Sequence, residues 1–227
     1  MNNSGLFITF EGGEGAGKSS LIQEIATYLT SLGHEPLISR EPGGCVLAEK
    51  IRTLLLDIRS IKLSICDKAE LLLFLAARAQ HIEEVIQPAL TQGKIVLCDR
   101  FNDSTIAYQG EGRGLGFDRV QAWCEEVCTS VLPDKTFFLD VDPQEGLNRS
   151  RKVDKNEAAA QSLDRIERES ISFHQKVQRG FLKLIHHNPD RFIHLNANQA
   201  QAKVIQEALN QFEAFMKIRD IDGRNSN

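Results

Sequence analysis

The sequence has no apolar run long enough to cross a membrane, and it has no internal repeat, low-complexity segment or interdomain linker. A membrane-spanning helix needs about 20 consecutive apolar residues. The first five residues are polar and carry no charged side chain, whereas a secretory signal begins with basic residues. These absences predict a single domain over residues 1–227, cytoplasmic and without a membrane partner.

An excess of positive charge and a cysteine cluster are also missing. Lys and Arg number 27 against 31 Asp and Glu, which gives a formal net charge of −4. Proteins that bind nucleic acids usually carry a basic excess, so we expect no nucleic-acid partner, although a local basic cleft stays open. The five cysteines are scattered without zinc-ligand spacing, and reduced thiols in a cytoplasmic protein are the simpler interpretation.

The sequence does contain a glycine-rich stretch, residues 12–19 (GGEGAGKS), that fits the phosphate-binding pattern G-x-x-x-x-G-K-[ST]. The apolar residues 6–10 before it predict a buried strand, and apolar residues at helical spacing follow it from Leu21 to Leu32. In such a unit, backbone N–H groups and the helix N-terminus surround phosphate oxygens, Lys18 reaches the outer phosphates and the Ser19 hydroxyl binds Mg²⁺. The predicted ATP-binding residues are Gly12, Gly13, Glu14, Gly15, Ala16, Gly17, Lys18 and Ser19.

Strands and helices alternate along the whole chain. Strands are predicted at residues 6–10, 35–39, 94–98, 136–141 and 192–195. Helices are predicted at about 21–32, 47–56, 67–90 with a kink at Pro88, 119–131, 166–185 and 202–216. The glycine-rich residues 110–116 predict a loop, and the polar tail 219–227 predicts a frayed end. This alternation favours an α/β fold, a parallel sheet with helices on both faces.

Charged residues follow the ends of several predicted strands. They are Glu14, Arg40, Glu41, Asp99, Arg100 and the residues after Asp142. Because ligands in such sheets bind at the carboxyl ends of the strands, we expect these residues around one cleft. Asp99 can hold Mg²⁺ as the partner of Ser19, and Arg100 offers a planar fork to a phosphate. A structural ion pair between Asp99 and Arg100 is the alternative.

Two other patterns have an ordinary structural interpretation beside a functional one. Cationic side chains gather in residues 148–165 as Arg149, Arg151, Lys152, Lys155 and Arg165. They could close over a transferred phosphoryl group as a lid, or form a solvated surface run. Phe74 and Arg78 lie one helical turn apart and share a face, so they could hold a flat base. A core phenylalanine beside a surface arginine is the alternative.

Together these stretches resemble the bacterial thymidylate kinases. The matching segments are residues 10–19 (FEGGEGAGKS), 40–44 (REPGG), 71–81 (LLLFLAARAQH), 99–101 (DRF), Ser104, 107–110 (AYQG) and 163–167 (LDRIE). Many nucleotide-binding families share the P-loop, but this combination in this order is specific. The resemblance implies a P-loop NTPase-type fold with a five-stranded parallel sheet, and a mobile lid over about residues 148–165. It also implies transfer of the γ-phosphoryl group of ATP to dTMP, giving dTDP and ADP.

The resemblance further implies roles for single residues. The implied catalytic residues are Lys18, Arg100 and the lid arginines Arg149, Arg151 and Arg165. The implied dTMP-binding residues are Glu14, Arg52, Phe74, Arg78, Arg100, Ser104, Tyr108 and Gln109. Phe74 would stack on thymine and Arg78 would hydrogen-bond its edge. Arg100, with Arg52, would grip the acceptor phosphate.

Mg²⁺, held by Ser19 and Asp99, is the cofactor that the resemblance implies. The implied partners are dTMP, ATP and a second copy of the chain in a homodimer. Residues 153–162 make the lid longer than the family pattern, so it stays open which lid arginine reaches the phosphates. Cys45 also departs from the pattern, because it stands where a small hydroxyl residue is more usual.

Two other functions stay open at this point. A kinase for another nucleoside monophosphate would share the P-loop, but the pairs Phe74–Arg78 and Tyr108–Gln109 argue against it. A P-loop switch such as a GTPase normally reads guanine with an Asn-Lys-x-Asp stretch after a strand. No such stretch occurs in the sequence, so this interpretation is disfavoured.

Overall fold

The computed structural model describes residues 5–56, 64–129, 131–153 and 164–224, and of residues 151–153 and 219–224 it describes the backbone only. Its centre is a sheet of five parallel strands in the order β2-β3-β1-β4-β5. The strands are β1 (Leu6–Gly12), β2 (Leu37–Arg40), β3 (Ile95–Asp99), β4 (Lys135–Asp140) and β5 (Phe192–Asn196). The predicted α/β fold with a five-stranded parallel sheet is confirmed.

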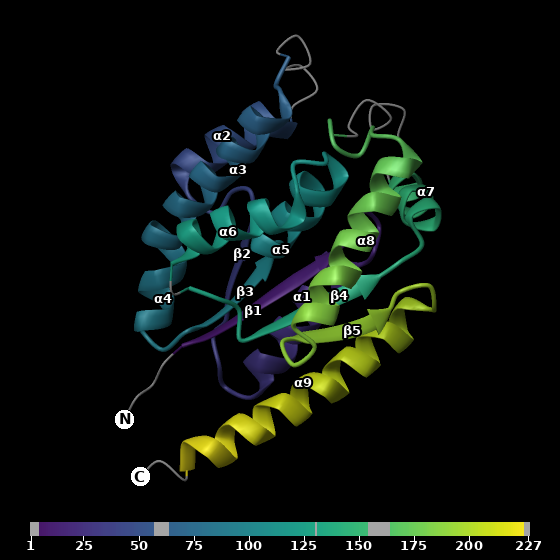
Figure 1. Ribbon diagram of the computed structural model, residues 1–227. Helices are drawn as coiled ribbons and strands as arrows, with labels where there is room; N and C mark the ends of the chain where they lie inside the picture. Colours follow the sequence, from purple (N-terminus) through teal and green to yellow (C-terminus); the bar gives the residue numbers. More distant parts are fainter. Residues whose placement is uncertain (1–4, 57–63, 130, 154–163, 225–227) are drawn as a thin grey trace.

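Helices cover both faces of this sheet (Figure 1). They are α1 (Lys18–Ser31), α2 (Val46–Leu56), α3 (Asp67–His81), α4 (Gln87–Thr91), α5 (Asn102–Thr105), α6 (Phe117–Cys128), α7 (Pro143–Val153), α8 (Ile171–His187) and α9 (Gln201–Arg224), with π-helical segments η2 (Ile82–Ile86) and η3 (Ile106–Gly112). The helix predicted to run to residue 90 is thus divided into α3, η2 and α4, and the π-helical turn directly precedes the turn that holds Pro88. Within the described ranges, no helix combines the length and the apolar composition that a membrane crossing requires.

The side chains of the central strand β1 alternate between the two faces of the sheet. Leu6, Ile8 and Phe10 pack in a core cluster with residues of α1 and α9. On the other face, Phe7 packs with residues of η2 and α4, and Glu11 contacts the turn that follows β3. Because β1 is buried on both faces, it carries a glutamate into the interior directly before the P-loop.

The predicted loop over residues 110–116 is wrong in its first part, because Gly110 and Gly112 belong to η3. Glycine serves close approach between helices here. A Cβ atom at Gly112 would lie 2.8 Å from the Phe173 ring in α8, and one at Gly180 of α8 would lie 2.9 Å from Cα of Ala107. Tertiary packing of η3 on α8 therefore outweighs the low helix propensity of glycine.

Two helix boundaries and one whole helix also differ from the prediction. The helix expected from residue 166 begins at Ile171, because Ser170 caps it by accepting a hydrogen bond at Oγ from the backbone N–H of Phe173 at 3.3 Å. The tail predicted to fray from residue 219 is helical as far as Arg224. Helix α7 was not predicted at all, and it contains residues 148–153 of the expected lid. The lid residues 154–163 lie outside the described residues.

Candidate active site

A cavity of about 900 Å³ opens where the strands of the sheet end. Residues that follow strands and the P-loop line it, among them Glu14, Lys18, Ser19, Arg40, Glu41, Asp99, Arg100 and Arg149. The predicted convergence of strand-end residues around one cleft is confirmed. Helix α3 adds Phe74 and Arg78 to the same cavity, and η3 adds Tyr108 and Gln109.

The P-loop between β1 and α1 has a backbone that only glycines adopt easily. The φ angle is positive at Gly12, Gly15 and Gly17. A Cβ atom at Gly15 would lie 2.1 Å from the carbonyl oxygen of Gly146 in α7, so the loop is supported from behind by that helix. Successive backbone N–H groups in such a loop form a concave site for phosphate oxygens at the start of α1.

Lys18 is the first residue of α1, and its side chain is buried against the P-loop. Its Nζ atom donates hydrogen bonds to the carbonyl oxygens of Gly12 at 3.3 Å and Gly13 at 3.1 Å. Burial and the nearby Arg100 lower the pKa of Lys18, although Asp99 and other acids act in the opposite direction. Lys18 and Arg100 repel each other at this cavity. A bound anion would relieve this repulsion, so the two cations together favour anion binding.

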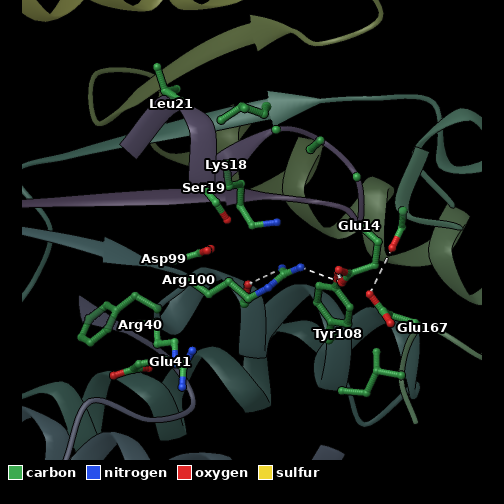
Figure 2. Close-up of a pocket in the computed structure, with 18 of the residues that line it drawn as sticks. Glu14, Lys18, Ser19, Leu21, Arg40, Glu41, Asp99, Arg100, Tyr108 and Glu167 are labelled. Atoms are coloured by element: carbon green, nitrogen blue, oxygen red, sulfur yellow. Dashed lines mark hydrogen bonds and ion pairs between the residues drawn. The ribbon is translucent and has the colours of Figure 1, made fainter. Parts of the chain in front are cut away.

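Arg100 directly follows β3 and turns its guanidinium towards Glu14 (Figure 2). Its Nη2 donates to Glu14 Oε1 at 2.7 Å, while Nη1 donates to the Gly12 carbonyl at 3.0 Å and to Ser104 Oγ at 3.1 Å. The guanidinium carbon lies 5.1 Å from the ring centroid of Tyr108, whose hydroxyl donates to Glu14 at 3.1 Å. Arg100 therefore pairs with Glu14 across the cavity, and the alternative of an ion pair with its neighbour Asp99 is wrong.

Glu14 stays charged despite its burial. Burial alone would raise its pKa, but Arg100 and Lys18 outweigh burial and lower the pKa below its usual value. The Tyr108 hydroxyl acts in the same direction by donating to the carboxylate. Glu14, Arg100 and Tyr108 thus form a charged, mutually bonded group next to the P-loop.

Arg78 of α3 is buried with 2% of its surface exposed, and it also lines the cavity. Its Nε donates to Glu41 Oε2 at 2.8 Å and its Nη2 donates to Thr105 Oγ1 at 2.9 Å. The guanidinium carbon lies 5.1 Å from the ring centroid of Phe101. The alternative of a surface arginine is therefore wrong for Arg78. Phe74, one turn earlier on α3, is half-buried and lines the same cavity.

Glu41 belongs to a buried chain of hydrogen bonds that the sequence did not reveal. Its Oε1 lies 3.0 Å from Nδ1 of His81, and Nε2 of His81 lies 2.6 Å from Oγ of Ser39. The carboxylate thus joins the end of β2 to helix α3 and holds Arg78 by an ion pair. Arg52, which was predicted to bind phosphate, also lines the cavity and donates from Nη1 to the carbonyl oxygen of Pro42 at 2.8 Å.

Glu70 of α3 binds two of the predicted site residues, Gln109 and Arg165, at a distance from the P-loop. Gln109 donates to its Oε1 at 2.9 Å, and Arg113 donates to both of its oxygens at 3.1 Å. Arg165 forms an ion pair with Glu70 and donates from Nε to the carbonyl oxygen of Leu55 at 3.1 Å. Burial would raise the pKa of Glu70, but Arg113 and Gln109 lower it. Gln109 reaches the cavity, whereas Arg165 is not among the residues that line it.

The other two predicted lid arginines are Arg149 and Arg151. Arg149 of α7 lines the cavity, where its Nη1 donates to the carbonyl oxygen of Ala197 at 2.8 Å and its Nε donates to Glu145 at 3.0 Å. The side chain of Arg151 lies outside the described residues. Among the lid arginines whose side chains are described, only Arg149 therefore meets the P-loop at the cavity.

Ser19 and Asp99 have the arrangement expected of a Mg²⁺ site. Both line the cavity and a second hollow next to it, and Asp99 Oδ1 is buried without a hydrogen-bond partner. Within the described part of the chain, no three His, Cys, Asp or Glu side chains gather to hold a metal by themselves. Mg²⁺ usually keeps waters and binds one or two protein oxygens together with substrate phosphates. The residues present therefore fit Mg²⁺.

Glu167 is another acid that faces Glu14 across the cavity. The carboxylate of Glu167 accepts hydrogen bonds from the backbone N–H of Asp164 at 2.9 Å and from Oγ of Ser150 at 3.4 Å, and Figure 2 shows it opposite Glu14. Burial raises the pKa of Glu167 to about 7, and the charges of Glu14 and Asp164 add to this effect. Glu167 thus titrates near neutral pH at the cavity wall.

We expect Glu167→Gln to reduce the pH dependence of stability. Between its usual pKa of 4.5 and about 7, Glu167 holds a proton in the folded protein that the unfolded chain has lost, so stability falls as the pH rises through this range. Glutamine cannot titrate, so the unfolding free energy of the variant should decline less from pH 5 to pH 8. Urea unfolding across this range measures the effect. Glu24→Gln, at an exposed position on α1, is the control. An unchanged pH slope in Glu167→Gln would contradict the assignment.

Little in the sequence points to the buried acids around the cavity. Glu11 is fully buried, and the segment resemblance assigned it no role. Its signal is a charged residue inside an otherwise apolar strand. Glu70 lies on a helix face that also carries leucines, and its partners Gln109 and Arg113 are about 40 residues away in the chain. Only the folded chain shows what such acids contact.

Comparison with known proteins places this geometry in one family. The family model described as Thymidylate kinase matches residues 10–208. A thymidylate kinase from Protochlamydia amoebophila is 54% identical over 209 residues, covering 92% of each chain. One from Desulfovibrio desulfuricans is 42% identical over 214 residues, covering 94% of this chain and 98% of that protein. The crystal structure of thymidylate kinase from Ehrlichia chaffeensis superposes with a TM-score of 0.72 at 32% identity, covering 92% of this chain and 99% of that one. At this identity and coverage, the chain belongs to the thymidylate kinase family.

Proposed function

We propose that the cavity binds its two nucleotides end to end, with ATP over the P-loop and dTMP against α3 and η3. The reaction is that of the family: the γ-phosphoryl group of ATP is transferred to dTMP, giving dTDP and ADP. Supporting this arrangement is Arg100, which lies between the P-loop and Tyr108 and contacts both sides. A group at this place can hold the acceptor phosphate in line with the donor.

The acceptor end has the features that thymine recognition needs. Phe74 offers an aromatic face, and Arg78 offers a guanidinium whose position is fixed by Glu41 and Thr105. Buried donors that are held in advance discriminate bases well, because a wrong base leaves them unpaired. We assign Phe74 to stacking on thymine, Arg78 to its edge, and Tyr108 with Glu14 to the sugar side.

Phosphoryl transfer spreads negative charge over the moving group, and this chain supplies cations to meet it. Lys18 and Arg100 stand at the cavity, and Arg149 enters it from α7. Arg165 would have to leave Glu70 before it could join them. We therefore assign the lid contribution to Arg149 first. The side chain of Arg151 and residues 154–163 lie outside the described residues.

We assign Mg²⁺ to Ser19 and Asp99, and the ion would supply charge neutralisation at the phosphates when bound. Replacement of Asp99 by asparagine is expected to raise the Mg²⁺ concentration needed for half-maximal rate by about 10- to 100-fold, as losses at metal sites usually do. Mg²⁺ titrations of the rate at saturating nucleotides measure this. Asp118→Asn, at the exposed start of α6, is the control. The same Mg²⁺ requirement in both variants would remove Asp99 from the site.

A homodimer is supported by exposed large apolar side chains on α2 and α3, two helices that pack side by side (Figure 1). Val46 is 75% exposed, Leu54 46% and Leu72 54%. Exposed apolar patches of this kind commonly mark interfaces between chains. Light scattering should therefore give twice the chain mass, and Leu54→Glu should halve it. Leu182→Glu on α8 is the control, and a monomeric wild type would contradict the proposal.

We place the protein in the cytoplasm. The supporting observation is that all five cysteines are free thiols, three of them buried. Burial raises the pKa of Cys98, Cys124 and Cys128, so these thiols are unreactive core residues rather than redox groups. Reduced cysteines are typical of cytoplasmic proteins.

Rates with a panel of nucleoside monophosphates test the assigned acceptor. ADP release is measured with ATP and Mg²⁺ in the presence of dTMP, dUMP, dCMP or AMP. We expect dTMP to react best and dUMP to react slowly, because loss of one methyl group in an apolar pocket changes kcat/KM by about 10- to 200-fold. A higher kcat/KM with AMP or dCMP would favour the alternative of a kinase for another nucleoside monophosphate.

A further inference from the structure

Glu11 is a fully buried carboxylate whose hydrogen bonds go to the turn that carries Arg100 and to helix α5 directly after it. It is the last residue but one of β1, on the sheet face opposite α1. Its Oε1 accepts hydrogen bonds from the backbone N–H groups of Phe101 at 2.7 Å and Ser104 at 3.3 Å. Its Oε2 accepts one from the Ser104 hydroxyl at 2.5 Å. One side chain thus binds three donors of a segment about 90 residues later in the chain.

The turn needs such support because its backbone is unfavourable. Arg100 has a φ angle of +66°, a left-handed conformation that is unfavourable for any residue with a side chain. The backbone N–H of Arg100 donates to the Phe10 carbonyl at 2.9 Å, and the next N–H, that of Phe101, donates to Glu11. Two successive residues of β1 therefore fix two successive residues of the turn. Any conformation that rotates these peptide groups away would leave a buried carboxylate without donors.

Glu11 also reaches the guanidinium of Arg100 through one intermediate. Ser104 Oγ donates to Glu11 and accepts from Arg100 Nη1 at 3.1 Å. A hydroxyl that donates in one direction must accept from the other, so Glu11 sets the direction of the Ser104 lone pair. A series of hydrogen bonds, Glu11–Ser104–Arg100–Glu14, therefore runs from the core of the sheet to the cavity.

This carboxylate is expensive for the fold, which favours a role beyond stability. Burial raises the pKa of Glu11 to about 7, and the charge of Asp103 on α5 adds to this effect. Arg100 and the donors at Ser104 and Phe101 act in the opposite direction. Asp103 itself is engaged by Arg191 at 2.6 and 2.8 Å. An apolar side chain at this strand position would avoid the cost of burying an acid.

We propose that Glu11 is a positioning residue for Arg100: it holds the β3–α5 turn and the Ser104 hydroxyl so that the guanidinium enters the cavity in the geometry that binds the acceptor phosphate. This inference rests on the proposed role of Arg100. It concerns dTMP and the transfer step, and leaves the P-loop contacts to ATP unchanged.

Glu11→Gln tests the proposal with little change in volume. An amide has one acceptor oxygen where the carboxylate has two. With its oxygen on the two backbone N–H groups, its NH2 must donate to Ser104 Oγ, which reverses that bond and competes with Arg100 for the hydroxyl oxygen, and the opposite orientation loses both backbone contacts. We expect the dissociation constant of dTMP, measured by calorimetry, to rise about tenfold, with the ATP dissociation constant changed less than about twofold. Thr9→Val is the matched control. Thr9 is buried two residues earlier on the same strand face and bonds Thr136 instead of the turn.

A double-mutant cycle shows whether Glu11 acts through Arg100. In an Arg100→Ala background, Glu11→Gln should weaken dTMP binding by less than about twofold further. An equal, additive loss in both backgrounds would show a general structural effect and overturn the proposal. If Arg100→Ala itself leaves dTMP binding intact, the assigned role of Arg100 fails instead. If Glu11→Gln does not fold, Ser104→Ala interrupts the same series of hydrogen bonds, and unchanged dTMP binding there would contradict the proposal.

Discussion

Arg100→Ala should lower kcat/KM for dTMP by about 100-fold or more while the protein stays folded. Removal of one preorganised charge-stabilising contact costs about 3 kcal/mol of transition-state stabilisation. The KM for ATP should change little, because the P-loop backbone and Lys18 are left in place. Glu14 keeps the Tyr108 hydroxyl and Lys18 as partners, so its charge is not left unbalanced. Steady-state kinetics with each substrate varied in turn give the split.

Two further variants show whether the loss comes from the guanidinium of Arg100. Arg100→Lys keeps the charge but loses the planar fork, so its loss should be smaller than that of alanine yet still clear. Arg119→Ala removes an arginine on α6 whose guanidinium lies over Trp123 at 5.3 Å, outside the cavity lining. Arg119→Ala should retain the kinetics of the wild type. Near-normal kcat/KM in Arg100→Ala would remove Arg100 from the acceptor site.

Lys18→Met is the second change for which we expect a large effect, with activity and stability moving in opposite directions. The ammonium is buried, and burial together with Arg100 lowers its pKa, which shows that the charge is held at a cost to the fold. Methionine of similar length removes this cost, so the melting temperature should stay the same or rise. The rate of phosphoryl transfer should fall by about 100- to 1000-fold, because the transferring group loses a positioned cation.

Lys203→Met is the control for this variant, because Lys203 is exposed on α9. Both its rate and its melting temperature should match the wild type. Thermal unfolding and single-turnover rates measured on the same preparations separate the two effects of Lys18→Met. A lower melting temperature with a proportionate loss of activity would mean that Lys18 supports the fold, and a normal rate would mean that it does not serve transfer.

The sequence predicted those parts of the site that follow from local pattern. Apolar strands alternating with helices predicted a parallel sheet, and the rule that ligands bind at strand ends brought Glu14, Asp99 and Arg100 to one cavity. The P-loop spacing gave the glycine backbone and the place of Lys18 at the start of α1. The strands and the P-loop are predicted from residues close to one another in the chain, where spacing is informative.

The parts that escaped prediction depend on contacts between distant residues. Gly112 is helical because α8 approaches it closely, and the sequence alone gives glycine the opposite preference. Arg165 stood among the expected lid cations, but the structure places it on Glu70, 95 residues earlier in the chain. Glu11 was visible only as an acid inside an apolar strand, since its donors lie beyond β3. Buried charges are matched by tertiary partners, and spacing along the chain does not encode these.

Consumption of thymidylate by the purified protein shows directly whether the cavity joins the two nucleotides. ATP, Mg²⁺ and dTMP are mixed with the protein, and ADP and dTDP are quantified together. We expect the two products to form in equal amounts, with no appreciable ADP when dTMP is left out. Release of ADP that does not depend on dTMP, or no dTDP at all, would contradict a cavity that joins the two nucleotides.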